Sequence, residues 1–338
     1  MKVCVLMGGK SSEYDVSIVS GTMVARTLVC REHSVMITVV DKKGNWKFSR
    51  GFVKEVEEIE KIIDGSLCSS GYPEDALRQM RESSIEVVFP ALHGPWGEDG
   101  KIQGFLEICS LPYVGSSTAG SAVSNDKLLT KYILRAHALP VPDYTVINEG
   151  YVEKHLEYIE TPCVIKSPCQ GSSFGLAVAK TTDELKKYVK EIIEMEHHVM
   201  VEKFIKGREL TCGVLQTGKN EISALSPTEI IPRVSDYFDF KAKYEVGGSD
   251  EITPAEVSEE ISLQVQQLAI RVHRALGMGH LSRTDFILDE NDELHILESN
   301  ALPGFTGTSL FPQAAAHAGY SFGELIELLL NNAVNDIK

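Results

Sequence analysis

Short apolar runs and amphipathic stretches follow each other over the first third of the chain. The run Lys2 to Met7 ends at Gly8-Gly9, and apolar residues at helical spacing follow as far as Val24. Further strand-like runs span Val35 to Val40 and Ile85 to Phe89. A strand, a glycine turn and a helix in succession are typical of parallel α/β units. The pattern therefore predicts a small parallel α/β domain.

The middle of the chain mixes strand and helix periodicities. A helix is predicted over Asp126 to Ala138, and strands around Cys163 to Lys166 and Gly175 to Ala179. The next helix is opened by Thr181-x-x-Glu184, a capping-box pattern in which each side chain bonds to the other residue's backbone N–H. This order of elements predicts a compact α+β lid.

The last third alternates strands with helices. Strands are predicted at Arg208 to Val214, Thr284 to Leu288 and Leu294 to Leu297, and helices at Ser258 to Leu276 and Ser321 to Ala333. Between them, Arg233 to Thr253 is polar and aperiodic, which predicts a long loop of the kind that forms a lid.

A chain of 338 residues is longer than one hydrophobic core normally supports. The patterns divide it into an N-terminal α/β domain over 1–115, a central lid subdomain over 116–202 and a C-terminal subdomain over 203–338. The last of these includes a mobile loop at about 233–253. The predicted fold class is α/β, with α+β character in the lid.

Composition narrows the class of partner. The net charge is −15, and 43% hydrophobic with 24% charged residues is the make-up of an ordinary soluble protein. Nucleic acids and anionic membranes require clustered Lys and Arg, so neither is expected as a partner. The apolar runs are too short to span a membrane. Seven scattered cysteines without a C-x-x-C pair argue against disulfides or zinc and favour a cytoplasmic location.

Acidic and amide side chains come together in the hairpin that the last two strands predict. If its turn is centred on Asn291-Asp292, Asp285 faces Glu298 across the strands. Arg283 then faces Asn300, and all four side chains project from one face. Facing carboxylates repel each other unless a cation lies between them, and these oxygen ligands suit Mg²⁺. The alternative is a solvent-exposed hairpin with incidental charges.

Glycine-rich segments offer candidates for phosphate binding. Gly8 to Ser11 ends like a P-loop, but the first glycine of that motif would fall on Cys4, and no G-x-G-x-x-G occurs. Gln170 to Gly175 lies between two predicted strands, with Lys166 upstream, so its N–H groups could cover phosphates that the lysine neutralises. Taken alone, it is equally compatible with a plain turn. The linker Glu202 to Ile205 is a weaker nucleotide candidate.

Six segments, taken in order, resemble the D-alanine-D-alanine ligases of the ATP-grasp superfamily over nearly the whole chain. They are Gly8 to Glu13, Leu92 to Gly100, Gly171 to Gly175, Asp239 to Tyr244, Ser282 to Phe286 and Glu298 to Thr306. The resemblance implies the ATP-grasp fold and a homodimer formed through the first domain.

The resemblance also implies which residues bind ATP and metal. Two Mg²⁺ ions, for which Mn²⁺ can substitute, would bridge the ATP phosphates and be held by Asp285, Glu298 and Asn300. Among the ATP contacts, three lysines would touch phosphates, Glu202 to Ile205 the adenine and Glu209 the ribose. The full set of implied ATP contacts is Lys127, Lys166, Ser172, Ser173, Glu202, Lys203, Phe204, Ile205, Glu209 and Lys243.

Substrate contacts are implied in the same way. Glu13 would hold the ammonium of the first D-alanine, with His93 nearby. Ser309 would hold the carboxylate of the second D-alanine, next to Leu310. Without the resemblance, His93 would be interpreted as an ordinary loop histidine.

The catalytic residues implied are Arg283 and the Gly304 N–H, which would stabilise a tetrahedral oxyanion. Tyr244 would close over the site and hydrogen-bond with Ser172, which links to Glu13. The first D-alanine would attack the γ-phosphate to give an acyl phosphate and ADP, and the amine of the second would attack that carbonyl. The dipeptide would serve peptidoglycan precursor synthesis.

Three alternatives remain open at this point. A ligase of the same fold could take D-serine or D-lactate as its second substrate, although D-lactate ligases typically carry histidine where this chain has Tyr244. A non-catalytic nucleotide-binding module is disfavoured by the full set of metal ligands together with Arg283. Another ATP-grasp enzyme, with a different carboxylate and amine, is opposed only by the substrate-end residues Glu13, Lys243, Tyr244 and Ser309.

Overall fold

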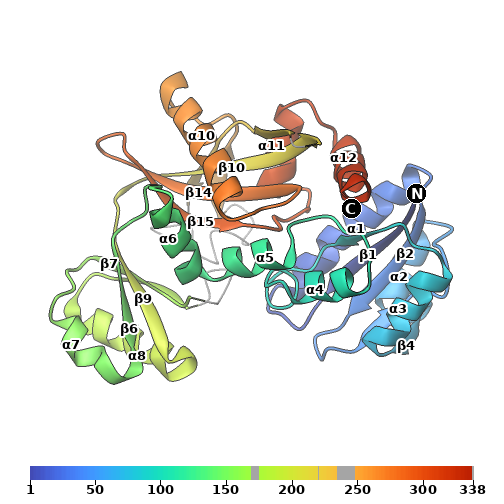
Figure 1. Ribbon diagram of the computed structural model, residues 1–338, viewed down its shortest axis with the longest axis horizontal. Helices are drawn as coiled ribbons and strands as arrows, with labels where there is room; N and C mark the ends of the chain where they lie inside the picture. The colour runs from blue at the N-terminus through green and yellow to red at the C-terminus, as the bar shows by residue number, and fades with distance from the viewer. Residues whose placement is uncertain (169–174, 220, 234–247, 337–338) are drawn as a thin grey trace.

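The structure, a computed structural model, describes residues 1–168, 175–219, 221–233 and 248–336. Its described strands form three sheets. In Figure 1 the first sheet lies at one end of the molecule, the second at the opposite end, and the third above and between them. This is the α/β architecture, with α+β character, that the sequence predicts.

The first sheet has the strand order β4-β3-β2-β1-β5. Its strands are β1 (Lys2–Gly8), β2 (Ser34–Val40), β3 (Trp46–Phe48), β4 (Ser69–Gly71) and β5 (Val87–Pro90). β1 runs parallel to β2 and β5, as predicted, and β3 and β4, which the apolar pattern does not predict, extend the sheet antiparallel. Alternate residues of β1 enter two different cores, Val5 one and Leu6 the other, which accounts for its uninterrupted apolar run.

Helices from both ends of the chain cover this sheet. Helices α1 (Tyr14–Cys30) and α2 (Glu57–Ile63) pack on one face, and α3 (Pro73–Glu82) and α4 (Lys101–Ile108) on the other. The C-terminal helices α11 (Leu310–His317) and α12 (Phe322–Asn335) join the core on the α1 face, and Figure 1 shows α12 beside α1. The division at 115 and 202 stays a prediction, but the last two helices share a core with the first domain.

The second sheet lies in the segment that was predicted to form the lid, and this part of the molecule is called the lid below; its strands have the antiparallel order β6-β9-β7-β8. Its elements are β6 (Tyr144–Asn148), η1 (Glu149–Tyr151), α7 (Val152–Leu156), β7 (Cys163–Lys166), β8 (Leu176–Ala179), α8 (Thr182–Glu196) and β9 (His198–Lys203). The capping box of Thr181 and Glu184 is present at the start of α8, which confirms that prediction. Buried residues of α8, including Leu185 and Val189, form a core with β7 and β9.

The third sheet has the order β13-β12-β10-β14-β15, with β11 paired to β10. Its elements are β10 (Gly207–Gly218), β11 (Glu221–Ala224), β12 (Thr228–Pro232), β13 (Ser249–Ile252), α10 (Glu259–Ala275), β14 (Leu281–Asp289) and β15 (Leu294–Asn300). The prediction of a loop is wrong for residues 249–252, because β13 pairs with β12 in a regular antiparallel ladder. Residues 234–247 of that predicted loop lie outside the described residues.

The β14–β15 hairpin has the predicted pairs but not the predicted turn. Asp285 faces Glu298 and Arg283 faces Asn300, as expected. Beyond Asp285 the register shifts, so that Phe286 pairs with Ile296, which leaves one extra residue on β15. Next to the turn the strands pair one residue out of the predicted register, because the turn is centred on Asn291 and not between Asn291 and Asp292. The bulge restores the predicted register at Asp285, so the pairing at the site is as predicted.

Two helices connect the first sheet to the lid. They are α5 (Thr118–Asn125) and α6 (Lys127–Ala136), and the Asp126 carboxylate caps α6 by accepting from the N–H groups of Leu128 and Leu129. This cap fixes the start of α6 and with it the position of Lys127. In the part of the chain that the structure describes, no helix combines the length and apolar character needed to cross a membrane.

Candidate active site

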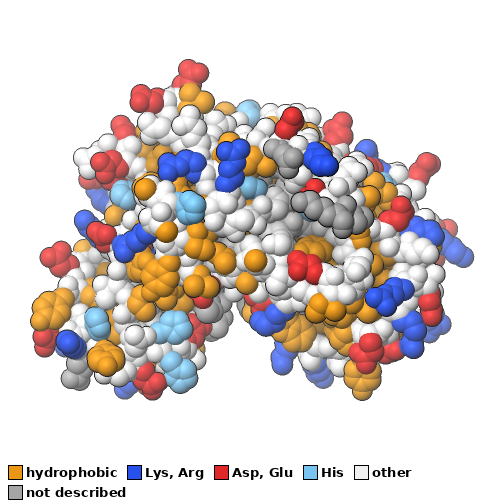
Figure 2. All heavy atoms as spheres, in the orientation of Figure 1, with side chains coloured by type: hydrophobic (Ala, Val, Ile, Leu, Met, Phe, Trp, Pro, Cys, Tyr) orange, Lys and Arg blue, Asp and Glu red, His pale blue; other side chains and the backbone are white. Residues whose placement is uncertain are grey.

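A cavity of about 710 Å³ is lined by residues of the second and third sheets, together with α1 and loop residues of the first domain. On the face shown in Figure 2, a notch separates the lid from the first domain. Every predicted site residue that the structure describes lines this cavity. These residues are Glu13, His93, Lys127, Lys166, Glu202, Lys203, Phe204, Ile205, Glu209, Arg283, Asp285, Glu298, Asn300, Gly304, Ser309 and Leu310. Four predicted site residues lie outside the described residues: Ser172, Ser173, Lys243 and Tyr244.

The acidic face of the hairpin opens into this cavity. Arg283 donates from Nε and Nη2 to the two oxygens of Asp285, each at 3.0 Å, and the Thr211 hydroxyl donates to Asp285 Oδ1 at 2.5 Å. Opposite, Glu298 Oε2 lies 3.7 Å from Lys127 Nζ. Cationic groups thus accompany both facing carboxylates, which would otherwise repel each other.

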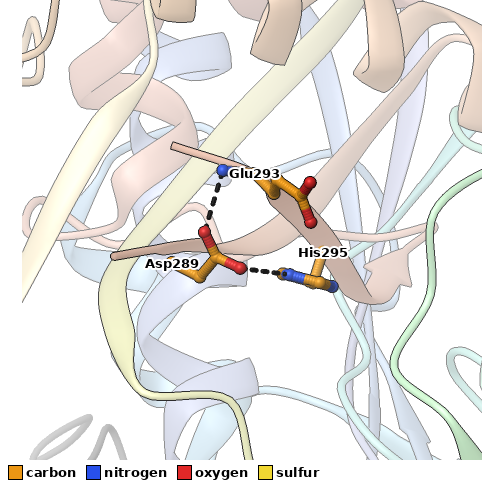
Figure 3. Close-up of side chains that lie close together, drawn as sticks. All are labelled: Asp289, Glu293 and His295. Carbon is orange, nitrogen blue, oxygen red and sulfur yellow. Dashed lines mark hydrogen bonds and ion pairs between the residues drawn. The ribbon is translucent and has the colours of Figure 1, made fainter. Parts of the chain in front are cut away.

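A second cluster of potential metal ligands lies at the turn of the same hairpin. Asp289, Glu293 and His295 bring one ligand atom each within 4.8 Å of one another (Figure 3). The Asp289 carboxylate, however, is already used by the turn. Oδ1 accepts from the N–H groups of Asn291 and Glu293, and Oδ2 lies 3.0 Å from His295 Nε2. We interpret this cluster as the cap of the turn.

A buried group of charges joins the lid to the rest of the cavity. Glu202, on β9, lies between Lys131 Nζ at 2.8 Å and Lys166 Nζ at 2.6 Å, and none of the three side chains is more than 7% exposed. Lys131 Nζ also donates to the Ile296 carbonyl at 3.0 Å. Burial lowers the pKa of Lys131 to about 8. Burial alone would raise the pKa of Glu202, but the two ammonium groups outweigh it and hold it below its usual range.

This group alters the interpretation of Glu202. Its carboxylate contacts two lysines, so this residue could contact adenine only through its backbone. The side chain instead positions Lys166. Lys131 was missed by the sequence reasoning. Its spacing of four residues from Lys127 in a helix places both on one face, and that signal could have indicated it.

Glu13 and His93 lie at the end of the cavity next to the first sheet. Both are buried, and His93 Nε2 lies 3.1 Å from Ser20 Oγ, while Nδ1 lies 3.5 Å from Glu98 Oε1. Burial raises the pKa of Glu98, and the nearby Glu13 charge adds to that shift. Glu98 was not predicted as a site residue, although it falls within the segment Leu92 to Gly100 that carries the resemblance.

Gly94 makes this arrangement possible. Its φ of +72° favours glycine, and a Cβ there would lie 2.8 Å from Glu13 Oε2 and 2.5 Å from Ser11 Oγ. Any side chain at this position would therefore displace the Glu13 carboxylate, which is predicted to bind the ammonium of the first substrate.

The loop before α11 carries Gly304 and Ser309, and it lies near His93, because the Phe305 N–H donates to Ser20 Oγ at 3.3 Å. A Cβ at Gly304 would lie 2.8 Å from Ser309 Oγ, so the two are immediate neighbours. Ser309 stands at the N-cap of α11, but its side chain does not cap the helix; Oγ accepts from the Thr306 N–H at 3.0 Å. The helix N-terminus and the hydroxyl together form a suitable place for a carboxylate.

Apolar side chains line the part of the cavity between the lid and the third sheet. They include Val164 and Val178 of the lid and Ile287 and Leu297 of the hairpin, and the linker from β9 to β10 runs past them. Apolar walls next to the backbone of a linker suit a nucleobase. Lys127 and Lys166 line the same cavity as this apolar slot.

Comparisons with known proteins agree with this geometry. A family model described as D-ala D-ala ligase N-terminus matches residues 2–116, and one described as D-ala D-ala ligase C-terminus matches residues 115–331. A D-alanine–D-alanine ligase of Leptospira interrogans (serovar Lai, strain 56601) is 38% identical over 351 residues, covering 98% of this chain and 99% of that protein. One from Desulfotalea psychrophila is 44% identical over 253 residues, covering 73% and 78%.

Solved structures are similar over nearly their whole length. The D-alanine-D-alanine ligase from Coxiella burnetii superposes with a TM-score of 0.82 at 29% identity, covering 100% of this chain and 94% of that one. The VanG D-Ala:D-Ser ligase from Enterococcus faecalis superposes with a TM-score of 0.85 at 28% identity, covering 98% of this chain and 99% of that one. The fold is therefore the one predicted, and the chain belongs to the D-alanine-D-alanine ligase family, a group of ATP-dependent ligases with the ATP-grasp fold.

Proposed function

We propose that this protein uses ATP to join two D-alanines into D-alanyl-D-alanine, a precursor of peptidoglycan. The observation that carries the proposal is the hairpin face of Arg283, Asp285, Glu298 and Asn300, which opens into a cavity with a lysine-lined region and an apolar slot. Family membership supports the same conclusion.

The hairpin residues fit magnesium. Asp285 and Glu298 face each other directly, and Asn300 adds an amide oxygen on the same face, which is the hard-oxygen set that Mg²⁺ prefers. These three residues would hold the metal, and Mn²⁺ would be accepted by the same oxygens. When bound, two ions would neutralise charge on the transferring phosphoryl group.

In the first step the protein positions one D-alanine against ATP. Glu13 binds its ammonium, while Lys127 and Lys166 neutralise the phosphates. A carboxylate oxygen of D-alanine attacks the γ-phosphorus, the bond from that phosphorus to the bridging oxygen breaks, and ADP leaves. The product is D-alanyl phosphate, which must be kept from water.

In the second step the amine of the other D-alanine attacks the acyl carbon. Ser309 holds the carboxylate of this acceptor, and Arg283 with the Gly304 N–H stabilises the oxyanion. The carbon–oxygen bond to phosphate then breaks, and the amine loses its proton. No covalent enzyme intermediate is needed, so catalysis comes from positioning and electrostatics.

A panel of acceptors tests the proposal. Phosphate release is measured with D-alanine and MgATP, alone and with D-lactate or D-serine added. Turnover with D-alanine alone and a D-Ala-D-Ala product are expected. No turnover with D-alanine alone would overturn the specificity.

D-serine is the second candidate acceptor, because the VanG D-Ala:D-Ser ligase superposes as well as the D-alanine ligase does. The fold therefore does not distinguish the two, and the same panel decides between them. Tyr244, which favours D-alanine by resemblance, lies outside the described residues.

We also propose a cytoplasmic location, because the reaction consumes ATP and the six described cysteines are free thiols. The homodimer stays a prediction that light scattering of the purified protein can check.

A further inference from the structure

One carboxylate of the cavity has no part in the mechanism above. Glu251, on β13, lines the same cavity as Arg283 and Ser309 and is partly buried. Its Oε2 accepts from Gln313 Nε2 at 2.9 Å, and the same nitrogen donates to the Thr308 carbonyl at 2.9 Å. Gln313 therefore fixes Glu251 against the loop that carries Ser309.

Three other acidic groups of the cavity already interact with cations. Asp285 accepts two bonds from Arg283, Glu202 lies between two lysines, and Glu298 lies near Lys127. Among the residues that the structure describes, Glu251 makes one hydrogen bond, through Oε2. Its Oε1 is thus available to a group bound in the cavity.

The acceptor end of the cavity presents a charge problem. An amino acid acceptor arrives mainly as an ammonium at neutral pH, toward the region that the Arg283 guanidinium occupies. Two cations repel each other more strongly in a partly water-excluded cavity than in water. Burial raises the pKa of Glu251, while the Gln313 hydrogen bond and the nearby Arg283 charge oppose that shift. The carboxyl group is therefore electrostatically coupled to the arginine.

We propose that Glu251 recognises the ammonium of the acceptor amino acid and thereby selects an amine acceptor over a hydroxyl acceptor. The inference rests on the proposed ligase function and deepens it. Glu251 Oε1 supplies the counter-charge that lets the ammonium approach Arg283, and Ser309 holds the carboxylate of the same molecule. Its role is in binding and specificity, before the amine loses its proton.

Glu251→Gln tests this with little structural change. The glutamine carbonyl can still accept from Gln313 Nε2, so the substitution removes the charge and keeps the tether. Asp250→Asn is the matched control, because it removes one negative charge from the adjacent residue of β13, whose side chain is exposed and pairs with Arg233. Initial-rate kinetics with D-alanine and MgATP separate the KM of the first D-alanine from that of the second.

Glu251→Gln should raise the KM of the second D-alanine by about 10- to 100-fold, since a bond to a charged group is lost. The KM of the first D-alanine should be unchanged, and Asp250→Asn should behave as wild type. An unchanged second KM, or a rise in both KM values, would overturn the inference. A wild-type protein that does not ligate D-alanine would instead overturn the proposed function.

Discussion

Replacing Glu202 by Gln should destabilise the protein strongly. The substitution keeps the shape of the side chain but leaves two ammonium groups, Lys131 at 0% and Lys166 at 7% side-chain exposure, without their shared counter-charge. Removing one partner of a buried ion pair typically costs about 3–5 kcal/mol, because the remaining charge is buried and unpaired. A loss of this size is a large fraction of the stability of an ordinary protein.

The pH dependence of this stability loss distinguishes a lost charge interaction from a packing defect. Burial already lowers the pKa of Lys131 to about 8 in the folded wild type, below its value of 10.5 in an unfolded chain. Loss of Glu202 would lower that folded-state pKa further. Between pH 7 and 8 the unfolded variant then binds a proton that the folded variant does not, so its stability rises with pH more steeply than that of the wild type, whose folded state loses this proton only near pH 8. The stability difference should shrink as pH rises.

Urea unfolding at pH 7 and pH 8 measures both effects. The matched control is Glu290→Gln, which breaks an ion pair of the same length, 2.6 Å to Lys206, on the exposed surface, and should change stability little. A loss below about 1 kcal/mol in Glu202→Gln, or a loss equal at both pH values, would refute the electrostatic account.

Three further predictions concern the site and the core. Glu298→Gln should lower kcat by about two orders of magnitude or more without unfolding the protein, whereas Glu293→Gln, at the turn of the same hairpin, should not; near-normal turnover of the first variant would contradict the metal assignment. Gly94→Ala should raise the KM of the first D-alanine, because its Cβ would meet Glu13, and an unchanged KM would place that substrate elsewhere. Burial lowers the pKa of His273 to about 4, so the unfolded state takes up the proton first and wild-type stability should fall by up to about 3 kcal/mol from pH 6.5 to 4. His273→Gln should flatten that slope in urea titrations, and an unchanged slope would assign it to other groups.

Local signals predicted the elements that carry the site. The capping boxes at Thr181 and Ser321 are both present, because each is completed within four residues. The pairing of Asp285 with Glu298 also followed from a local hairpin. That prediction is correct although the predicted turn is wrong, because a bulge on β15 restores the register. Nothing in the apolar pattern indicates the bulge.

Features that depend on tertiary contacts were not predictable in the same way. β3, β4 and β13 have three or four residues each, too few for a periodicity to emerge, and they form because a neighbouring strand offers hydrogen bonds. Glu251 was missed for this reason, since its strand was taken as loop. The return of α12 to the first sheet is likewise set by packing across the whole length of the chain.

The central claim is that ATP activates a D-alanine carboxylate in this cavity. D-alanine labelled with ¹⁸O in its carboxylate, incubated with the protein and MgATP, tests it directly. The account predicts one ADP and one inorganic phosphate carrying a single ¹⁸O for each D-alanyl-D-alanine formed. Dipeptide accompanied by unlabelled phosphate, or formed without ADP, would contradict it.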